Sequence, residues 1–469
     1  MIFNPRENVK TAGVFEIPGE VNARAHSCLN KEIFKEFWNN FTFGASRLDL
    51  EETDGYVFSV GEAKPLPLDG CGYSINVEPL GIRICAADKR SLIEGFMTLL
   101  DLFRAVDVNG ETVAAIDCRQ LRDSAAVRIR MVHYCILPET ELWELQRFLR
   151  FCGALKYTHV ILEFWGMLKY DCMKELSWSH AFTKEQIRPI IDEAHALGLE
   201  IVPMFNHWGH ASACRVMHGK HVVLDQNPSL QTYFSPDGWC WDIGKPKVRE
   251  LLRNIRRELC ELCGEGEYFH VGCDEAYNFD MTKEESMKTV CDYLNGISAE
   301  LTKEGRRTIT WGDMFLYKYP EYNPANRYAC NAPSPESERF MLENLSRDII
   351  IADWQYDSKE APVETASVFT KAGFECLLCP WDRGYAETAA CIKTIKEERL
   401  CGLIHTTWHT LSSGTPYVLL AAVHAYEKNC GMKNREARTY AAALLRKVMP
   451  SGGNYERSGW SRYQISFKW

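Results

Sequence analysis

The sequence has no surplus of basic residues and no long apolar segment. Its 54 Lys and Arg residues are outnumbered by 63 Asp and Glu residues, which gives a formal net charge of −9. A chain with this balance has little positive charge for neutralising phosphates, so we expect no nucleic-acid partner. No apolar run approaches the roughly 18 residues of a membrane-spanning helix, so we expect no membrane partner either.

The first residues lack the apolar core of a secretory signal. Arg6, Lys10, Glu16 and Glu20 interrupt the segment in which a core of about 7–15 apolar residues would lie. The 19 cysteines are too sparse for a disulfide scaffold in 469 residues, and an odd number cannot all pair within one chain. We therefore expect reduced thiols and a cytoplasmic location.

Two Cys-x-x-Cys pairs, Cys260/Cys263 and Cys376/Cys379, have the spacing of zinc or redox sites. The first pair falls late in an amphipathic helical pattern, and the second falls in the apolar run 374–380. In such surroundings cysteine behaves as a small hydrophobic residue. We therefore predict that neither pair binds a metal or acts as a redox site.

The composition, with 46% hydrophobic and 25% charged residues, predicts one large globular domain and a smaller one. From residue 127 onward, short β-branched runs alternate with helical patterns. The predicted strands are 127–135, 158–164, 200–205, 268–272, 308–311, 349–354, 375–380 and 402–407. The predicted helices are 140–151, 183–197, 247–263, 282–303, 362–372 and 387–399. Eight βα units over about 300 residues favour a (β/α)8 TIM barrel, with a doubly wound open sheet as the alternative.

The residues before the barrel read as a small α/β accessory domain, 1–122, with strand-like stretches at 56–60 and 74–86 and a helix at 91–103. The polar segment 119–126 marks the boundary. The catalytic barrel then spans 123–430. We expect residues 431–469 to pack on the barrel as a helix, 434–448, and a tail.

In a (β/α)8 barrel, the active site forms at the carboxyl ends of the strands. Asp274 and Glu275 follow the fourth predicted strand, and the segment 206–210 follows the third. Two adjacent carboxylates near an apolar rim repel each other, which raises the pKa of one of them and suits it to act as a general acid. Taken alone, an Asp-Glu pair is more often a solvated pair.

Four tryptophans end or follow the last four predicted strands: Trp311, Trp354, Trp381 and Trp408. A single tryptophan at such a position usually packs against the core. Four at one rim indicate a pocket for a sugar, because the apolar face of a pyranose stacks on indole while its hydroxyls bind polar groups nearby.

The string 270–275, His-Val-Gly-Cys-Asp-Glu, resembles the His-x-Gly-x-Asp-Glu signature of family 20 glycoside hydrolases, the β-N-acetylhexosaminidases. The segment 206–210 is similar to the Asp-x-Pro-Gly-His stretch of the family, and 310–313 is similar to its Trp-x-Glu segment. Residues 72–103 resemble part of its accessory domain. The resemblance covers nearly the whole chain and is that of a divergent branch.

The resemblance implies a retaining exo-enzyme that removes terminal β-linked N-acetylglucosamine or N-acetylgalactosamine from glycans. In this family the 2-acetamido oxygen of the substrate attacks C1 and forms an oxazolinium intermediate. Glu275 would then be the general acid/base, and Asp274 would orient the acetamido group and stabilise its charge. His210 would support the acid, or have a purely structural role. The mechanism requires no metal and no organic cofactor.

The resemblance also implies a set of substrate-binding residues. Arg130 is the choice for holding the ring hydroxyls, with Arg128 as the fallback, because the spacing from Asp123 to Arg130 matches the family. Trp354 and Trp408 resemble the walls of the acetamido pocket, and Trp311 stands where a further wall or subsite residue is expected.

Several positions depart from the family pattern. Trp381 and Asp382 stand where many members have Tyr-x-Asp, so the acetamido-binding tyrosine is left open between Tyr356 and Tyr385. His409 and Thr410 replace a glutamate that grips sugar hydroxyls in some members, which leaves the preference between glucosamine and galactosamine open.

Two other functions compete with this interpretation. One is a retaining β-glycosidase with two catalytic carboxylates, Glu275 and either Glu163 or Asp313. The other is a catalytically silent sugar-binding barrel, which would keep the tryptophans but has no need of the Asp-Glu pair. The sequence leaves the linkage, the aglycone and the oligomeric state open.

Overall fold

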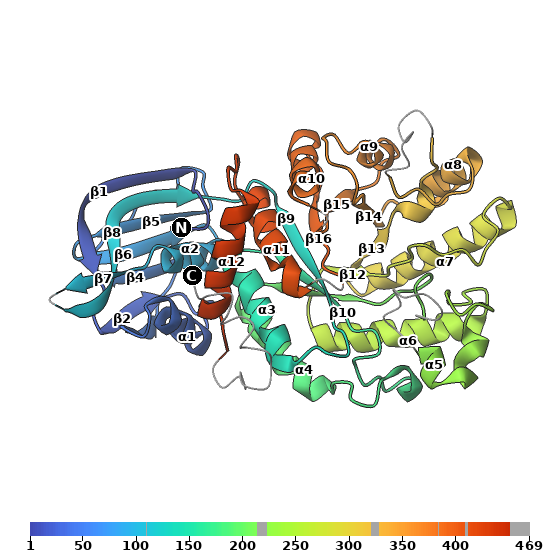
Figure 1. The fold of residues 1–469 in the computed structure, drawn as a ribbon, viewed down its shortest axis with the longest axis horizontal. Coiled ribbons are helices and arrows are strands. Elements are labelled where there is room, and N and C mark those ends of the chain that lie inside the picture. The colour runs from blue at the N-terminus through green and yellow to red at the C-terminus, as the bar shows by residue number, and fades with distance from the viewer. Residues whose placement is uncertain (109, 213–222, 320–327, 383, 409–410, 451–469) are drawn as a thin grey trace.

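The computed structural model describes residues 1–108, 110–212, 223–319, 328–382, 384–408 and 411–450. These residues form a sheet domain followed by a barrel (Figure 1). No helix in these ranges combines the length and the apolarity needed to cross a membrane.

The barrel is closed, and all of its neighbouring strands are parallel. Its strands are β9 (Ile129–Cys135), β10 (His159–Glu163), β11 (Glu200–Met204), β12 (Tyr268–His270), β13 (Arg307–Trp311), β14 (Ile350–Trp354), β15 (Cys376–Cys379) and β16 (Gly402–His405). Because β16 pairs with β9, no sheet edge remains, and the open doubly wound sheet is excluded. The predicted (β/α)8 barrel is confirmed.

Helices surround the barrel (Figure 1): α3 (Leu142–Ala154), α4 (Lys184–Ala196), α5 (Val223–Gln226), α6 (Pro246–Cys263), α7 (Glu284–Lys303), α8 (Pro335–Asn344), α9 (Glu364–Lys371), α10 (Tyr385–Glu398) and α11 (Leu411–Tyr426). Short 3-10 turns lie at Lys174–Leu176, Pro228–Tyr233 and Asp313–Phe315. Each predicted helix overlaps one of these, but α5, α8 and α11 were not predicted. Residues 418–426 of α11 are all buried, so this helix has no polar face to give it a helical period.

The N-terminal domain is an eight-stranded sheet in the order β1-β8-β5-β6-β4-β2-β3, with β7 paired to β8. Its strands are β1 (Glu7–Glu16), β2 (Glu20–Ala25), β3 (Arg47–Glu52), β4 (Val57–Gly61), β5 (Tyr73–Glu78), β6 (Gly81–Ala86), β7 (Arg104–Val108) and β8 (Glu111–Asp123). Its helices are α1 (Lys31–Phe41) and α2 (Lys89–Asp101). The predicted strand 74–86 is a hairpin of two antiparallel strands, β5 and β6.

The last helix, α12 (Asn434–Lys447), contacts α11 and α3 of the barrel and also α1 of the sheet domain. In Figure 1 it lies between the two domains. The predicted C-terminal unit extends to residue 469, and its part from residue 451 onward lies outside the described residues.

The second Cys-x-x-Cys pair lies on β15, where its two residues face opposite sides of the strand. Cys379 belongs to the cluster inside the barrel, and Cys376 belongs to the core outside it. Both thiols are free. Two sulfurs on opposite faces of one strand cannot bind the same ion.

Candidate active site

Two loops interlock at the carboxyl end of the barrel, and glycines make this contact possible. A Cβ atom on Gly209, in the loop after β11, would lie 1.8 Å from the carbonyl oxygen of Asp274. A Cβ atom on Gly272, in the loop after β12, would lie 1.7 Å from Oδ1 of Asn206, and its φ is +66°. Only glycine fits these positions. The close contact joins the two segments that the sequence singled out.

His210 contacts both of the adjacent carboxylates. Its Nε2 lies 3.0 Å from Oε2 of Glu275 and 3.4 Å from Oδ2 of Asp274. The side chain of Glu275 is 37% exposed, whereas that of Asp274 is 9% exposed. Oδ1 of Asp274 is buried and has no hydrogen-bond partner among the described residues. The two carboxylates therefore differ, since one reaches solvent and the other is a buried acceptor.

Burial dominates the electrostatics of this group. It raises the pKa of Asp274; His210 opposes this rise, and the carboxylates of Asp313 and Glu275 add to it. Burial by itself lowers the pKa of His210, but Asp274 and Glu275 outweigh burial, so the pKa of His210 is raised. The sequence predicted that proximity raises the pKa of one carboxylate of the pair. The pKa of Asp274 is raised, and burial contributes more to this rise than the neighbouring carboxylates do.

Asp313 is a positioning group in this site. Its Oδ2 accepts hydrogen bonds from the backbone N–H of Glu275 at 3.0 Å and the side-chain amide of Asn331 at 2.7 Å. Its Oδ1 accepts the indole N–H of Trp354 at 3.1 Å. Burial raises the pKa of Asp313. The carboxylate ties the loop of Glu275 to one tryptophan of the rim.

Glu163, at the end of β10, is bound in a similar way. Its Oε2 lies 2.9 Å from Nε2 of His133 and 3.2 Å from Sγ of Cys135, and its Oε1 accepts the amide N–H of Asn206 at 2.9 Å. Glu163 and Asp313 are each 1% exposed. Neither carboxylate considered as the nucleophile of a two-carboxylate enzyme is open to solvent.

An aromatic cluster lies at the carboxyl ends of β14, β15 and β16. The ring centroid of Tyr356 lies 5.1 Å from that of Trp354 and 5.2 Å from that of Trp381. The indole N–H of Trp408 donates to the hydroxyl of Tyr356 at 2.8 Å. All four rings are partly exposed. They offer a ligand apolar surface with one central hydroxyl, as expected for a sugar pocket.

Trp311 lies deeper than these rings. It is fully buried inside the barrel, with its ring centroid 4.3 Å from His270 and 5.7 Å from Trp408. It supports the aromatic cluster from within and is not an exposed wall of it.

The structure separates the two candidate tyrosines. The Tyr356 hydroxyl lies in the aromatic cluster, 3.1 Å from Oγ1 of Thr406. Tyr385 is 36% exposed at the start of α10 and packs on His424. Only Tyr356 lies with the tryptophans.

Two further predicted positions follow the last strands. Asp382 comes directly after Trp381 beyond β15 and is partly exposed. His409 and Thr410, which follow Trp408, lie outside the described residues.

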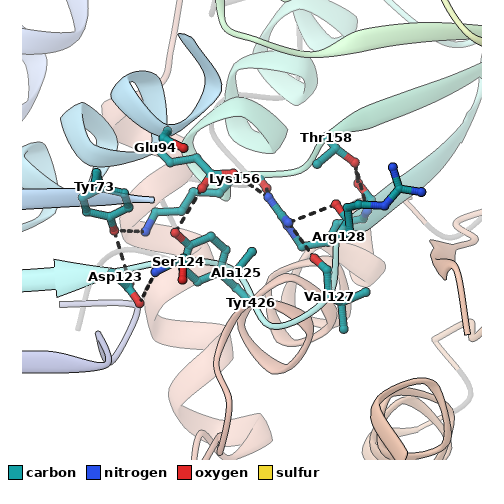
Figure 2. Close-up of polar contacts among 12 residues, drawn as sticks. Tyr73, Glu94, Asp123, Ser124, Ala125, Val127, Arg128, Lys156, Thr158 and Tyr426 are labelled. Atoms are coloured by element: carbon teal, nitrogen blue, oxygen red, sulfur yellow. Dashed lines mark hydrogen bonds and ion pairs between the residues drawn. The ribbon is translucent and has the colours of Figure 1, made fainter. Parts of the chain in front are cut away.

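The prediction that Arg130 binds sugar hydroxyls is wrong. Arg130 is near the amino end of β9, at the end of the barrel opposite to the site, and it is 2% exposed. Its guanidinium pairs with Glu94 of α2 at 2.6 Å and donates to the carbonyls of Val127 and Lys156. Figure 2 shows this polar network between the two domains. Arg128 precedes β9 at the same end, so the fallback fails for the same reason.

Sequence reasoning missed Trp239. Its indole N–H donates to the carbonyl oxygen of Glu275 at 2.7 Å, and its ring lies 4.3 Å from that of His210. It belongs to the long segment between β11 and β12, away from any strand end. No periodic pattern or motif marks that position.

Comparison with known proteins identifies the family of the barrel domain. The model of the glycosyl hydrolase family 20 catalytic domain matches residues 123–412, which contain all of the barrel strands. A β-hexosaminidase of Porphyromonas gingivalis is 24% identical over 305 residues, which make up 56% of this chain and 38% of that protein. The match thus covers well under half of the length of that relative.

Solved structures share the fold at low identity. An exo-β-N-acetylglucosaminidase from Vibrio harveyi, solved with N-acetylglucosamine, has a TM-score of 0.67 at 14% identity. The alignment covers 95% of this chain and 77% of the Vibrio chain. A β-N-acetylhexosaminidase from Bacteroides fragilis has a TM-score of 0.64 at 14% identity, and the alignment covers 97% of this chain and 95% of the Bacteroides chain. Since the family model covers most of the chain, the chain belongs to glycosyl hydrolase family 20.

Proposed function

We propose that this chain is a retaining exo-β-N-acetylhexosaminidase that removes terminal β-linked N-acetylglucosamine or N-acetylgalactosamine with the help of the substrate's own acetamido group. The observation that supports this most is the buried Oδ1 of Asp274, which has no partner among the described residues. An unpaired buried acceptor costs roughly 1–3 kcal/mol. The acetamido N–H of a bound substrate would supply the missing donor.

Asp274 is suited to stabilising positive charge on the acetamido group. As the acetamido oxygen attacks C1, positive charge spreads over the forming oxazolinium ring. A buried carboxylate interacts strongly with such charge because little water screens it. Its interaction with His210, at 3.4 Å, keeps the carboxylate oriented before substrate binds.

Glu275 is suited to the proton transfers. Its side chain is the more exposed of the pair, so it can reach the glycosidic oxygen. In the first step, the C1–O bond breaks, the acetamido oxygen bonds to C1, and Glu275 gives its proton to the leaving oxygen. In the second step, a water adds to C1, Glu275 takes a proton from it, and the oxazolinium ring opens. The two displacements retain the anomeric configuration.

Tyr356 is suited to holding the acetamido oxygen. Its hydroxyl oxygen already accepts the indole N–H of Trp408, which leaves its proton for another acceptor. Burial raises the pKa of Tyr356 well above its ordinary value, so the hydroxyl stays protonated. Stacking on Trp354 and Trp408 would hold the acetamido group beside it.

The test is a panel of p-nitrophenyl β-glycosides together with a thiazoline analogue of N-acetylglucosamine. We expect hydrolysis of the N-acetylglucosaminide, the N-acetylgalactosaminide or both, no hydrolysis of the glucoside or galactoside, and inhibition by the thiazoline. Comparable hydrolysis of the glucoside without thiazoline inhibition would support the two-carboxylate enzyme. Binding of the sugar without any turnover would support a silent sugar-binding barrel.

A further inference from the structure

Three metal-binding side chains converge inside the barrel, next to the catalytic pair but apart from it. They are His133 and Cys135 of β9 and Glu163 of β10, and all three are buried. His133 and Cys135 are two residues apart, so they face the same side of their strand. Glu163 is the register partner of Cys135 on the neighbouring strand. Ordinary parallel pairing therefore brings the three side chains together.

The donor atoms are spaced so that one ion can bind them all. Nε2 of His133 lies 2.9 Å from Oε2 of Glu163, Sγ of Cys135 lies 3.2 Å from the same oxygen, and Sγ and Nε2 are 3.6 Å apart. A circle through three points with these separations has a radius of about 1.9 Å, which is shorter than zinc–ligand bonds of about 2.0–2.3 Å. A zinc ion slightly out of the plane of the three atoms would therefore reach each of them without movement of the strands.

The donor chemistry favours zinc over magnesium and calcium. A sulfur and an imidazole nitrogen suit a borderline-soft ion, whereas magnesium and calcium prefer oxygen ligands only. A thiolate and a carboxylate together carry two negative charges, which a divalent ion neutralises inside an apolar barrel. Three protein ligands leave the fourth tetrahedral position for another group.

The surrounding residues orient the set. The amide of Asn206 binds Oε1 of Glu163 and leaves Oε2 directed at His133 and Cys135. Asn206 is itself fixed, because its backbone carbonyl accepts the indole N–H of Trp241 at 2.9 Å. Such outer contacts are typical of metal-binding carboxylates.

We infer that His133, Cys135 and Glu163 form a zinc site beside the aromatic cluster. The ring of His133 lies 4.7 Å from that of Trp408, so an ion bound there would fix the back of the pocket. The hydrolytic steps proposed above do not use this ion. The inference therefore departs from the expectation that the chain binds no metal, but it leaves the roles of Asp274 and Glu275 unchanged.

The test compares zinc binding in the purified chain of 469 residues and in its Cys135→Ser variant. A serine hydroxyl can still donate to Glu163, so a site held only by hydrogen bonds tolerates this change, whereas a zinc site loses its thiolate. We expect about one tightly bound zinc per chain in the wild type and roughly 100-fold or more weaker binding in the variant, measured by competition with a chromogenic chelator. Cys379→Ser, at another buried barrel strand end, is the matched control and should bind as the wild type does.

Equal zinc affinity in wild type and Cys135→Ser would overturn the inference, as would a wild type without tight binding. If Cys135→Ser does not fold, X-ray absorption on the zinc-loaded wild type decides. One sulfur at about 2.3 Å together with nitrogen or oxygen ligands at about 2.0–2.2 Å supports the site, and two or more sulfurs contradict it. Both measurements are made without substrate, so their outcome is independent of the hydrolase proposal.

Discussion

Nε2 of His210 lies 3.0 Å from Oε2 of Glu275, and this contact links the loop after β11 to the loop after β12. The backbone of both residues is in a strained conformation. His210 has a φ of +53° and Glu275 a φ of +46°, a left-handed conformation that costs side-chain-bearing residues about 1 kcal/mol or more. The site therefore combines backbone strain with a buried carboxylate, and both oppose folding.

Asp274→Asn should stabilise the fold at high pH. Because the pKa of Asp274 is raised in the folded state, the folded chain holds a proton that the unfolded chain loses as pH rises above the ordinary aspartate range. Wild-type stability therefore falls with rising pH through this range, and the variant escapes that loss. His210 acts in the same direction, because its raised pKa gives stabilisation at low pH that is lost as pH rises through the folded value.

We expect the variant to gain about 1 kcal/mol or more over the wild type between about pH 4 and about pH 8, measured by urea unfolding at each pH. Asp382→Asn, at the same rim but more exposed, is the control for removing a rim carboxylate. A difference between Asp274→Asn and wild type that stays constant with pH would contradict the raised pKa of the buried Asp274.

Tyr356→Phe should reduce kcat/KM on N-acetylated substrates by about 100-fold, since it removes one donor aimed at developing charge on the acetamido oxygen. Tyr385→Phe is the matched control, because Tyr385 lies on the surface away from the cluster, and its kinetics should equal those of the wild type. Equal effects of the two changes would exclude Tyr356 as the acetamido donor.

Trp408→Ala should cost about 2–4 kcal/mol of transition-state binding, because it removes a stacking wall and the partner of the Tyr356 hydroxyl. Trp354→Phe should lower kcat/KM less than Trp408→Ala does, because it keeps an aromatic ring although it loses the hydrogen bond to Asp313. The measurement is kcat/KM on the N-acetylglucosaminide. Wild-type values in both variants would mean that these rings only pack the barrel.

Arg130→Met should weaken folding and leave the chemistry intact. It leaves Glu94 buried without its ion-pair partner, which typically costs about 3–5 kcal/mol. Thermal unfolding should therefore shift strongly, while kcat/KM per folded molecule stays at the wild-type value. A variant that folds as well as the wild type but fails to bind substrate would contradict this structural role and support a sugar-binding role for Arg130.

Much of the barrel could be predicted because its strands are short β-branched runs, and every predicted strand overlaps an observed one. The Asp-Glu pair and the tryptophans could be placed at the rim because they directly follow strands. Arg130 was misplaced because the choice followed its spacing from Asp123 in the family pattern, although Arg130 falls in the amino-terminal half of the predicted strand 127–135. Trp239, Asn331 and Asn206 reach the site from loops, and their contacts with Glu275, Asp313 and Glu163 depend on chain packing that no local pattern encodes.

The most direct test of the account is the dependence of Asp274→Asn and Glu275→Gln on the leaving group. Glu275→Gln removes the proton donor, so its damage should shrink for substrates with acidic leaving groups that need no proton. Asp274→Asn keeps the donor but removes the charge that stabilises the oxazolinium, so kcat/KM should fall by about 10²–10³-fold for all leaving groups.

The measurement is kcat/KM for a series of aryl N-acetyl-β-glucosaminides of increasing leaving-group acidity, with wild type and both variants. A steeper dependence for Glu275→Gln than for the wild type, and a uniform loss for Asp274→Asn, is the predicted result. Near-wild-type activity of Asp274→Asn, with Glu163 or Asp313 essential and a glycosyl group trapped covalently on the enzyme, would contradict substrate assistance and support the two-carboxylate mechanism.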